Sequence, residues 1–148
     1  MMKQSALSKK YVAANEFIST FMSALSTLCK LAQSESQREE LASILRKTRI
    51  VYETPTAMII ASKYLPHIES YSERIIARDE AFLSTVNIRT ECANLGVTLD
   101  ESDNSLVMLF NSFRENYVRG DGAIKNMIYD HILSIHNAAM VYGQLQWV

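Results

Sequence analysis

Glycine and proline are scarce in this chain, and that scarcity limits the folds it can adopt more than any other feature. The 148 residues include 4 glycines and 2 prolines, well below average usage. Sandwiches and barrels need many tight turns, and these depend on glycine and proline. The sequence therefore excludes an all-β fold and favours an all-α protein.

Apolar residues recur at helical spacing along most of the chain. We predict a first helix over about residues 8–33 and a second that starts with a capping box formed by Ser36 and Glu39. Thr54 and Pro55 have the pattern of an N-cap followed by a first-turn proline, so a third helix should start there. Near the C-terminus, Asp121 should cap the last helix.

Pro66 lies inside an otherwise continuous helical pattern. Its ring removes one backbone hydrogen bond and disfavours helical geometry at the preceding residue, so we predict a kink or a break there. One long helix should follow over about residues 66–94, with Arg78 and Asp79 in the one turn that lacks an apolar residue. No repeat or linker interrupts the pattern. We therefore expect residues 1–148 to form a single-domain bundle of five or six helices with short loops.

The first and last helices have the most pronounced apolar faces. In the first, the apolar positions are Phe17, Ile18, Phe21, Met22, Leu25, Leu28 and Cys29. In the last, alternating steps of four and three residues connect Ile124, Ile128, His131, Ile135, Ala138, Tyr142 and Leu145. This heptad pattern predicts that the last helix is central or faces a partner.

No motif for catalysis, cofactor binding or metal binding is present. On a helix, His131 and His136 point about 140° apart, and the sequence has no E-x-x-H, no G-x-S-x-G and no phosphate-binding glycine loop. We therefore assign no catalytic, cofactor-binding or metal-binding residue and predict a protein that is not an enzyme. His131 is expected to be a hydrogen-bonded core histidine, with a pH-sensitive contact as the alternative.

The 15 basic and 16 acidic side chains give a net charge of −1, so we expect no general attraction to nucleic acid. Positive charge is concentrated only at Arg46, Lys47 and Arg49, which form either a solvated helix end or a contact for phosphate or an acidic partner. The uncharged stretch 17–29 is too short to span a membrane.

Two cysteines, Cys29 and Cys92, lie 63 positions apart without a C-x-x-C motif. This pattern is typical of free thiols in a reducing compartment, with a single disulfide between them as the alternative. We therefore expect an intracellular protein, in the cytoplasm or in a virion.

Broad apolar faces without recognisable chemistry favour an interaction or assembly subunit that binds a protein partner or itself. Viral and phage components often have this character. One alternative is a regulatory bundle that binds a partner helix in a methionine-lined groove, formed from Met22, Met58, Met108, Met127 and Met140. A second is a small-ligand carrier or enzyme with an enclosed pocket near a polar group such as His131.

Overall fold

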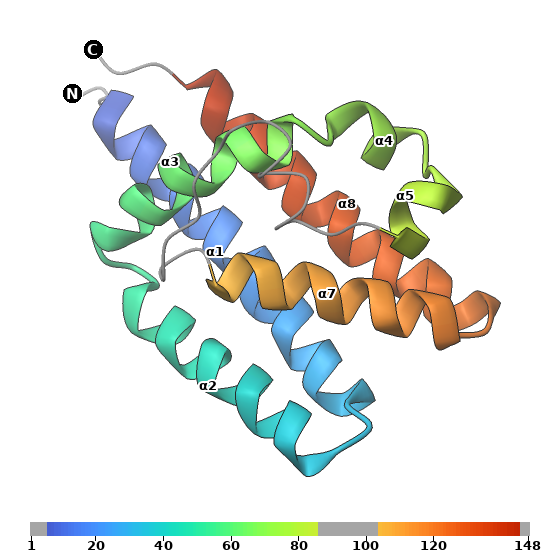
Figure 1. Ribbon diagram of the computed structural model, residues 1–148. Coiled ribbons are helices and arrows are strands. Elements are labelled where there is room, and N and C mark those ends of the chain that lie inside the picture. The colour runs from blue at the N-terminus through green and yellow to red at the C-terminus, as the bar shows by residue number, and fades with distance from the viewer. Residues whose placement is uncertain (1–5, 86–103, 146–148) are drawn as a thin grey trace.

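The computed structural model describes residues 6–85 and 104–145, and within these ranges it contains helices and no strands (Figure 1). The seven described helices are α1 (Ala6–Leu31), α2 (Glu35–Val51), α3 (Thr56–Glu69), α4 (Ser72–Ile76), α5 (Glu80–Thr85), α7 (Asn104–Arg119) and α8 (Gly122–Gln144). The all-α prediction is confirmed. Cys92 and the predicted helix end near residue 94 lie outside the described residues.

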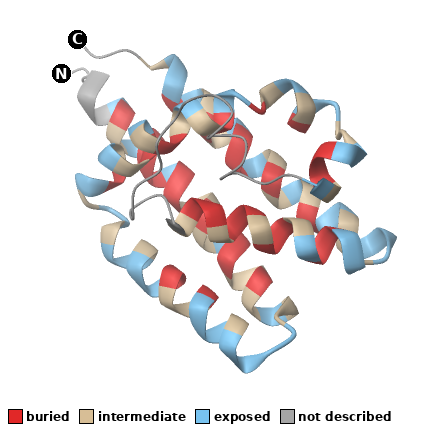
Figure 2. Ribbon diagram, in the orientation of Figure 1, coloured by how far each residue is buried: buried red, intermediate tan, exposed pale blue. Residues whose placement is uncertain are grey.

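Helix α1 is the centre of the bundle and packs against α2, α3, α7 and α8. Its buried apolar residues are Ala13, Ala14, Phe17, Ile18, Phe21, Ala24, Leu25 and Leu28. Figure 2 shows buried positions concentrated on the central helices and exposed positions along the outer side of α2. The broad apolar face of α1 is therefore covered mainly by other helices of the same chain.

Helix α8 also faces the interior, but its buried face differs in detail from the predicted one. The buried residues are Ile128, Ile132, Ile135, His136, Ala139 and Tyr142. The steps of four and three are retained, but they pass through Ile132 and Ala139, and the predicted positions His131 and Ala138 are only half-buried. This difference of one residue is enough to bury His136.

The predicted long helix over 66–94 is wrong within the described residues. Pro66 lies inside α3, which continues to Glu69 before the chain turns. A second break follows α4, where Arg78 adopts a left-handed φ of 49°. There the Asp79 N–H donates to the Arg74 carbonyl (3.0 Å) and the Arg78 N–H donates to the Ile75 carbonyl (3.0 Å), which is a Schellman motif.

Asp79 then starts the next helix, because its carboxylate accepts a hydrogen bond from the Phe82 N–H at 3.1 Å. The described residues therefore contain seven helices, where five or six were expected for the whole chain. The breaks occur where helix-ending hydrogen bonds form, at 70–71 and 77–79, rather than at the proline.

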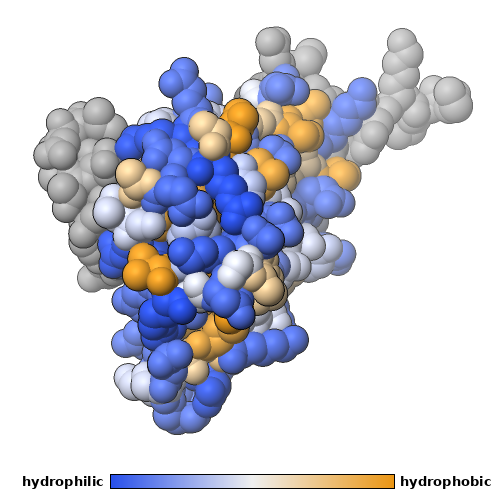
Figure 3. All heavy atoms as spheres, turned by 90° about the vertical axis from the view of Figure 1, so that its right-hand side faces the viewer, coloured by the Kyte–Doolittle hydropathy of each residue, from blue (hydrophilic) through white to orange (hydrophobic). Residues whose placement is uncertain are grey.

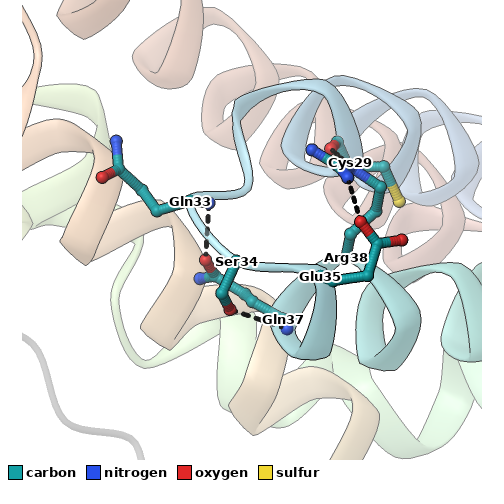
Figure 4. A network of polar contacts seen from close by, with 6 residues as sticks. All are labelled: Cys29, Gln33, Ser34, Glu35, Gln37 and Arg38. Atoms are coloured by element: carbon teal, nitrogen blue, oxygen red, sulfur yellow. Dashed lines mark hydrogen bonds and ion pairs between the residues drawn. The ribbon is translucent and has the colours of Figure 1, made fainter.

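The start of α2 has the predicted capping pattern, displaced by two residues (Figure 4). The Ser34 hydroxyl accepts from the Gln37 N–H (3.1 Å), and the Gln37 side-chain oxygen accepts from the Gln33 N–H (3.1 Å). Arg38 forms an ion pair with Glu35 at 2.7 Å. Ser36 is therefore not the cap, because Ser34 and Gln37 satisfy the free amides one half-turn earlier.

The other two predicted caps have opposite outcomes. The Thr54 hydroxyl donates to the Val51 carbonyl (2.7 Å) and does not cap α3. The Asp121 carboxylate accepts from the Ile124 N–H (3.0 Å), so the predicted cap of α8 is confirmed.

Candidate functional site

Exposed apolar residues on the surface are mostly scattered. On the face shown in Figure 3, apolar side chains form separate patches between hydrophilic ones. No described helix has both the length and the apolar character that a membrane span requires. The cavities between helices are therefore the better candidates for a functional site.

A groove of about 280 Å³ opens between α1, α2 and α3. Its apolar lining consists of Ile18, Phe21, Val51, Ile59, Ile60 and Tyr64, and its polar lining consists of Lys47, Thr48, Lys63 and Ser105. The described lining includes two lysines and no carboxylate. The groove can therefore accept apolar side chains, and the exposed Lys47 favours an anionic neighbour.

Buried aromatic packing forms part of the groove wall. The rings of Phe21 on α1 and Tyr64 on α3 lie 5.8 Å apart between centroids and are both buried. Ile59, five residues before Tyr64 on α3, is 67% exposed. The groove thus combines rigid buried walls with an accessible apolar residue, which is typical of a docking site for side chains.

The predicted basic cluster lies beside this groove. Arg46, Lys47 and Arg49 are all exposed near the C-terminal end of α2, and Lys47 lines the groove. None of the three forms an ion pair within the described part of the chain. Their charge is therefore available to a partner, as well as to solvent.

A second, polar cleft of about 200 Å³ lies between α2 and α7. Its lining includes Glu40 and Glu115, and Glu115 accepts a hydrogen bond from the Gln37 side-chain amide at 3.1 Å. The buried side-chain oxygen of Asn111 has no hydrogen-bond partner among the described residues. Two carboxylates do not complete a metal site, and the described residues contain no group of three or more acidic, histidine or cysteine ligands that could hold an ion.

The methionines occupy other positions. Met22, Met58, Met108 and Met140 are partly buried against the core, and Met127 is exposed. None of them is among the described residues that line the α1–α2–α3 groove. Branched and aromatic side chains therefore form this groove, in contrast to the methionine-lined groove considered from the sequence.

Sequence reasoning missed His136, which is buried between α4 and α8. Its Nε2 atom shares a hydrogen bond with the Ser72 hydroxyl, and its Nδ1 atom lies 3.1 Å from the Asn137 side-chain oxygen. A serine, a histidine and an orienting amide can support nucleophilic catalysis. No sequence signal indicates this grouping, because Ser72 and His136 lie 64 positions apart.

The contact between Ser72 and His136 lies away from both cavities described above. His136 is buried, Ser72 is half-buried, and neither lines the groove or the polar cleft. A nucleophile must meet its substrate in a site with convergent polar groups. The contact holds the short helix α4 against α8.

His131 connects α8 to α1 instead of lying in the core. It is half-buried, and its Nε2 atom is 2.9 Å from the Thr27 hydroxyl. Burial lowers the pKa of His131 below its ordinary value of 6.5, while the neighbouring carboxylate of Asp130 acts to raise it. The hydrogen bond predicted for His131 is present, but the residue is half-buried instead of lying in the core, and a pH-sensitive contact stays a prediction.

We expect His131 to make the protein less stable in acid. The unfolded chain binds the proton more readily than the folded chain, so the free energy of unfolding falls as pH falls through 6.5 toward the lower folded-state pKa. His131→Gln should weaken this dependence, because glutamine is neutral and can still reach Thr27. Urea unfolding at about pH 7.5 and about pH 5.5 measures the effect. An unchanged pH dependence in the variant would contradict it.

Cys29 has a free, half-buried thiol. Burial raises the pKa of this thiol, an effect that the charges of Arg38 and Arg49 partly oppose. A raised pKa keeps the sulfur protonated near neutral pH and therefore weakly nucleophilic. Cys29 is thus a packing residue.

Comparisons of this chain with protein-family models, with curated protein sequences and with solved structures find no match.

Proposed function

We propose that the protein is a non-enzymatic interaction subunit that binds an acidic, partly apolar segment of a partner protein in the α1–α2–α3 groove. The observation that carries this proposal is an accessible apolar groove whose lining includes Ile59, which is 67% exposed, and the exposed Lys47. The assembly in which the subunit works, including a viral or phage particle, then depends on the partner. The free thiol of Cys29 suits a reducing intracellular compartment.

The size of the groove favours side chains over a whole cofactor. Its volume of about 280 Å³ is just below the range of small-molecule sites, which occupy roughly 300–1,000 Å³. Burying one large apolar side chain contributes about 1.5–3 kcal/mol, while association itself costs about 4 kcal/mol or more. Two or three apolar anchors therefore give only modest affinity.

Electrostatic attraction between the groove and the partner adds to the affinity of these apolar contacts. Lys47 lines the groove on α2, and Arg46 and Arg49 add exposed positive charge next to it. Carboxylates flanking the apolar anchors of a partner would meet these groups at the rim. Rim charges mainly affect the association rate and the choice of partner, and salt screens them.

The test uses two labelled model peptides with leucines at helical positions i, i+3, i+4 and i+7, flanked in one by glutamates and in the other by lysines. Fluorescence anisotropy should show binding of the glutamate peptide, with a dissociation constant at least about tenfold lower than that of the lysine peptide. Ile59→Asp should weaken binding at least about tenfold, because the aspartate opposes burial of the anchors.

Ile76→Asp is the matched control, because Ile76 is similarly exposed but belongs to α4 and does not line the groove. Its affinity for the glutamate peptide should equal that of the unaltered protein. Equal affinity for the two peptides, or undiminished binding by Ile59→Asp, would overturn the proposal.

A further inference from the structure

A pocket of about 400 Å³ opens where the turn between α2 and α3 lies against the first half of α1. We call it the tyrosine pocket. Its described lining consists of Tyr11, Val12, Asn15 and Glu16 on α1 and of Tyr52 and Glu53 in the turn. None of these residues lines the α1–α2–α3 groove. A ligand of this pocket is therefore a question separate from the proposed function.

A buried asparagine joins the two walls of the tyrosine pocket. The Asn15 side-chain oxygen accepts a hydrogen bond from the Glu53 N–H (2.7 Å), and its side-chain nitrogen donates to the Tyr11 carbonyl (3.2 Å). Both polar atoms of this side chain thus have partners within the chain. The groups that the described lining offers to a ligand are therefore the tyrosine side chains, the methyl groups of Val12 and two carboxylates.

The charged groups of the described lining are both acidic. Glu16 and Glu53 are exposed, and neither forms an ion pair with any residue that the structure describes. Their carboxylates belong to different elements, α1 and the turn, and both reach the same pocket. A concave surface with charges of one sign attracts ions of the opposite sign, so this pocket favours a cation.

Bases near the tyrosine pocket in the sequence do not neutralise its carboxylates. Lys10 donates to the Tyr142 and Leu145 carbonyls at the end of α8. The charge of Arg49 acts on the Cys29 thiol, near the other end of α1. The exposed Lys9 lies two helical turns before Glu16 and is not part of the described lining.

Two tyrosines add a further attraction for a cation. Tyr11 is half-buried, and Tyr52 is 37% exposed. The face of an aromatic ring attracts a positive charge within about 6 Å of its centre. Val12, which is 50% exposed, adds apolar surface to the same pocket. Rings, methyl groups and carboxylates together suit a cation that has apolar substituents.

We propose that the tyrosine pocket binds a small organic cation of the alkylated ammonium class. Methyl groups on the nitrogen pack against the tyrosines and Val12, and the positive charge is attracted to Glu16 and Glu53. A fully alkylated nitrogen has no N–H group, so it requires no acceptor besides those already paired in the pocket. The volume of about 400 Å³ lies within the roughly 300–1,000 Å³ of small-molecule sites.

The exposure of these residues predicts weak binding. Cation–π contacts and carboxylates at exposed positions each contribute little free energy. We expect a dissociation constant of roughly 1–10 mM, which added salt should raise because it screens the carboxylates.

The test is a titration with choline chloride followed in ¹H–¹⁵N correlation spectra, with sodium chloride added to keep the ionic strength constant. Saturable shifts should occur at the backbone amides of Val12 and Glu53. The neutral alcohol in which a carbon atom replaces the choline nitrogen has the same shape and is the matched control ligand. Its dissociation constant should be at least about tenfold higher, because it lacks the charge.

Two sets of substitutions test the two kinds of group. Tyr52→Leu retains an apolar side chain without the ring and should raise the dissociation constant for choline about two- to fivefold. The double variant Glu16→Gln/Glu53→Gln should raise it by a similar factor. Glu73→Gln is the control, because Glu73 is an exposed acid on α4 outside the pocket, and it should leave the dissociation constant unchanged.

Glu53→Gly separates binding from folding. Glu53 adopts a left-handed φ of 61°, which glycine adopts without a steric cost. The N–H group that donates to Asn15 is retained in the variant. It should therefore unfold at the same temperature as the unaltered protein or higher, and still bind choline about twofold or more weakly.

Vesicles of phosphatidylcholine distinguish two sources of the same cation. Co-sedimentation of the unaltered protein with the vesicles, reduced in Tyr52→Leu, would identify a lipid headgroup as the source. Choline binding without co-sedimentation would identify a free small molecule.

Three results would overturn the proposal. The first is equal affinity for choline and for its neutral analogue. The second is a set of shifts dispersed over the surface instead of concentrated at the pocket. The third is an unchanged dissociation constant in Tyr52→Leu and in the double glutamine variant. None of these results bears on peptide binding in the α1–α2–α3 groove, because the two sites share no described lining residue.

Discussion

Phe17→Ala should lower the free energy of unfolding by about 3–5 kcal/mol, the usual cost of removing a buried phenylalanine. Phe17 lies in the middle of α1, is 1% exposed, and has its ring 6.0 Å from that of Phe21. The substitution would leave a cavity next to α1. Because α1 contacts four other helices, movement of a single helix cannot fill this cavity. Urea unfolding measures the loss.

For a chain of this length, the same change should lower the melting temperature by roughly 10 °C. Val12→Ala is the matched control, since Val12 lies on the same helix and is 50% exposed. It should change stability by less than about 0.5 kcal/mol. A similar effect of the two substitutions would show that α1 is not the centre of the core.

Lys10→Met should lower the free energy of unfolding by about 2–4 kcal/mol, because it removes a charged donor from two carbonyls. Lys10 is 5% exposed, and its Nζ atom donates to the carbonyls of Tyr142 (3.0 Å) and Leu145 (2.6 Å). The last carbonyls of a helix have no donors within the helix. Lys10 on α1 thus caps the C-terminal end of α8.

Burial of Lys10 carries a cost, because desolvation lowers the pKa of its ammonium group. The two carbonyls and the Tyr142 ring, whose centroid lies 4.2 Å from Nζ, offset that cost. Methionine retains most of the apolar stem but provides no donor. Hydrogen exchange at the end of α8 should therefore become faster, along with the loss of global stability.

Lys9→Met is the control for this prediction. Lys9 is the neighbouring residue of α1, carries the same charge and is exposed. Its substitution should change stability by less than about 0.5 kcal/mol. If the two variants were equally stable, the Lys10 contacts would not contribute to the stability of the folded chain.

The helix break at Arg78 and Asp79 could be predicted only in part from the local sequence. Arg78 and Asp79 were visible in the sequence as the one turn without an apolar residue, and the chain breaks there. The sequence pattern could not show that Arg78 would adopt a left-handed conformation, which arginine rarely takes. Contacts with α8 hold it there: Arg78 donates to the Asn126 side chain (2.7 Å) and lies 4.8 Å from the centre of the Tyr129 ring.

The lining of the α1–α2–α3 groove could also be predicted only in part from the sequence. The basic cluster of Arg46, Lys47 and Arg49 was evident from the sequence, since neighbours in sequence share a helix end. Lys63 and Phe21 could not be associated with it, because they come from α3 and α1 and meet Lys47 only when the three helices pack. Which histidine is buried also depended on packing, since the buried face of α8 is displaced by one residue position from the predicted one and includes His136 instead of His131.

The amino-acid sequence by itself determined the helical class, the broad buried face of α1 and the Asp121 cap, because these depend on residue composition, periodicity and hydrogen bonds between residues close in the chain. Tertiary structure alone decided where the 66–85 segment breaks, which histidine is buried and which side chains line the groove. These depend on side chains from distant helices, whose contacts outweigh local preferences of less than about 1 kcal/mol per residue.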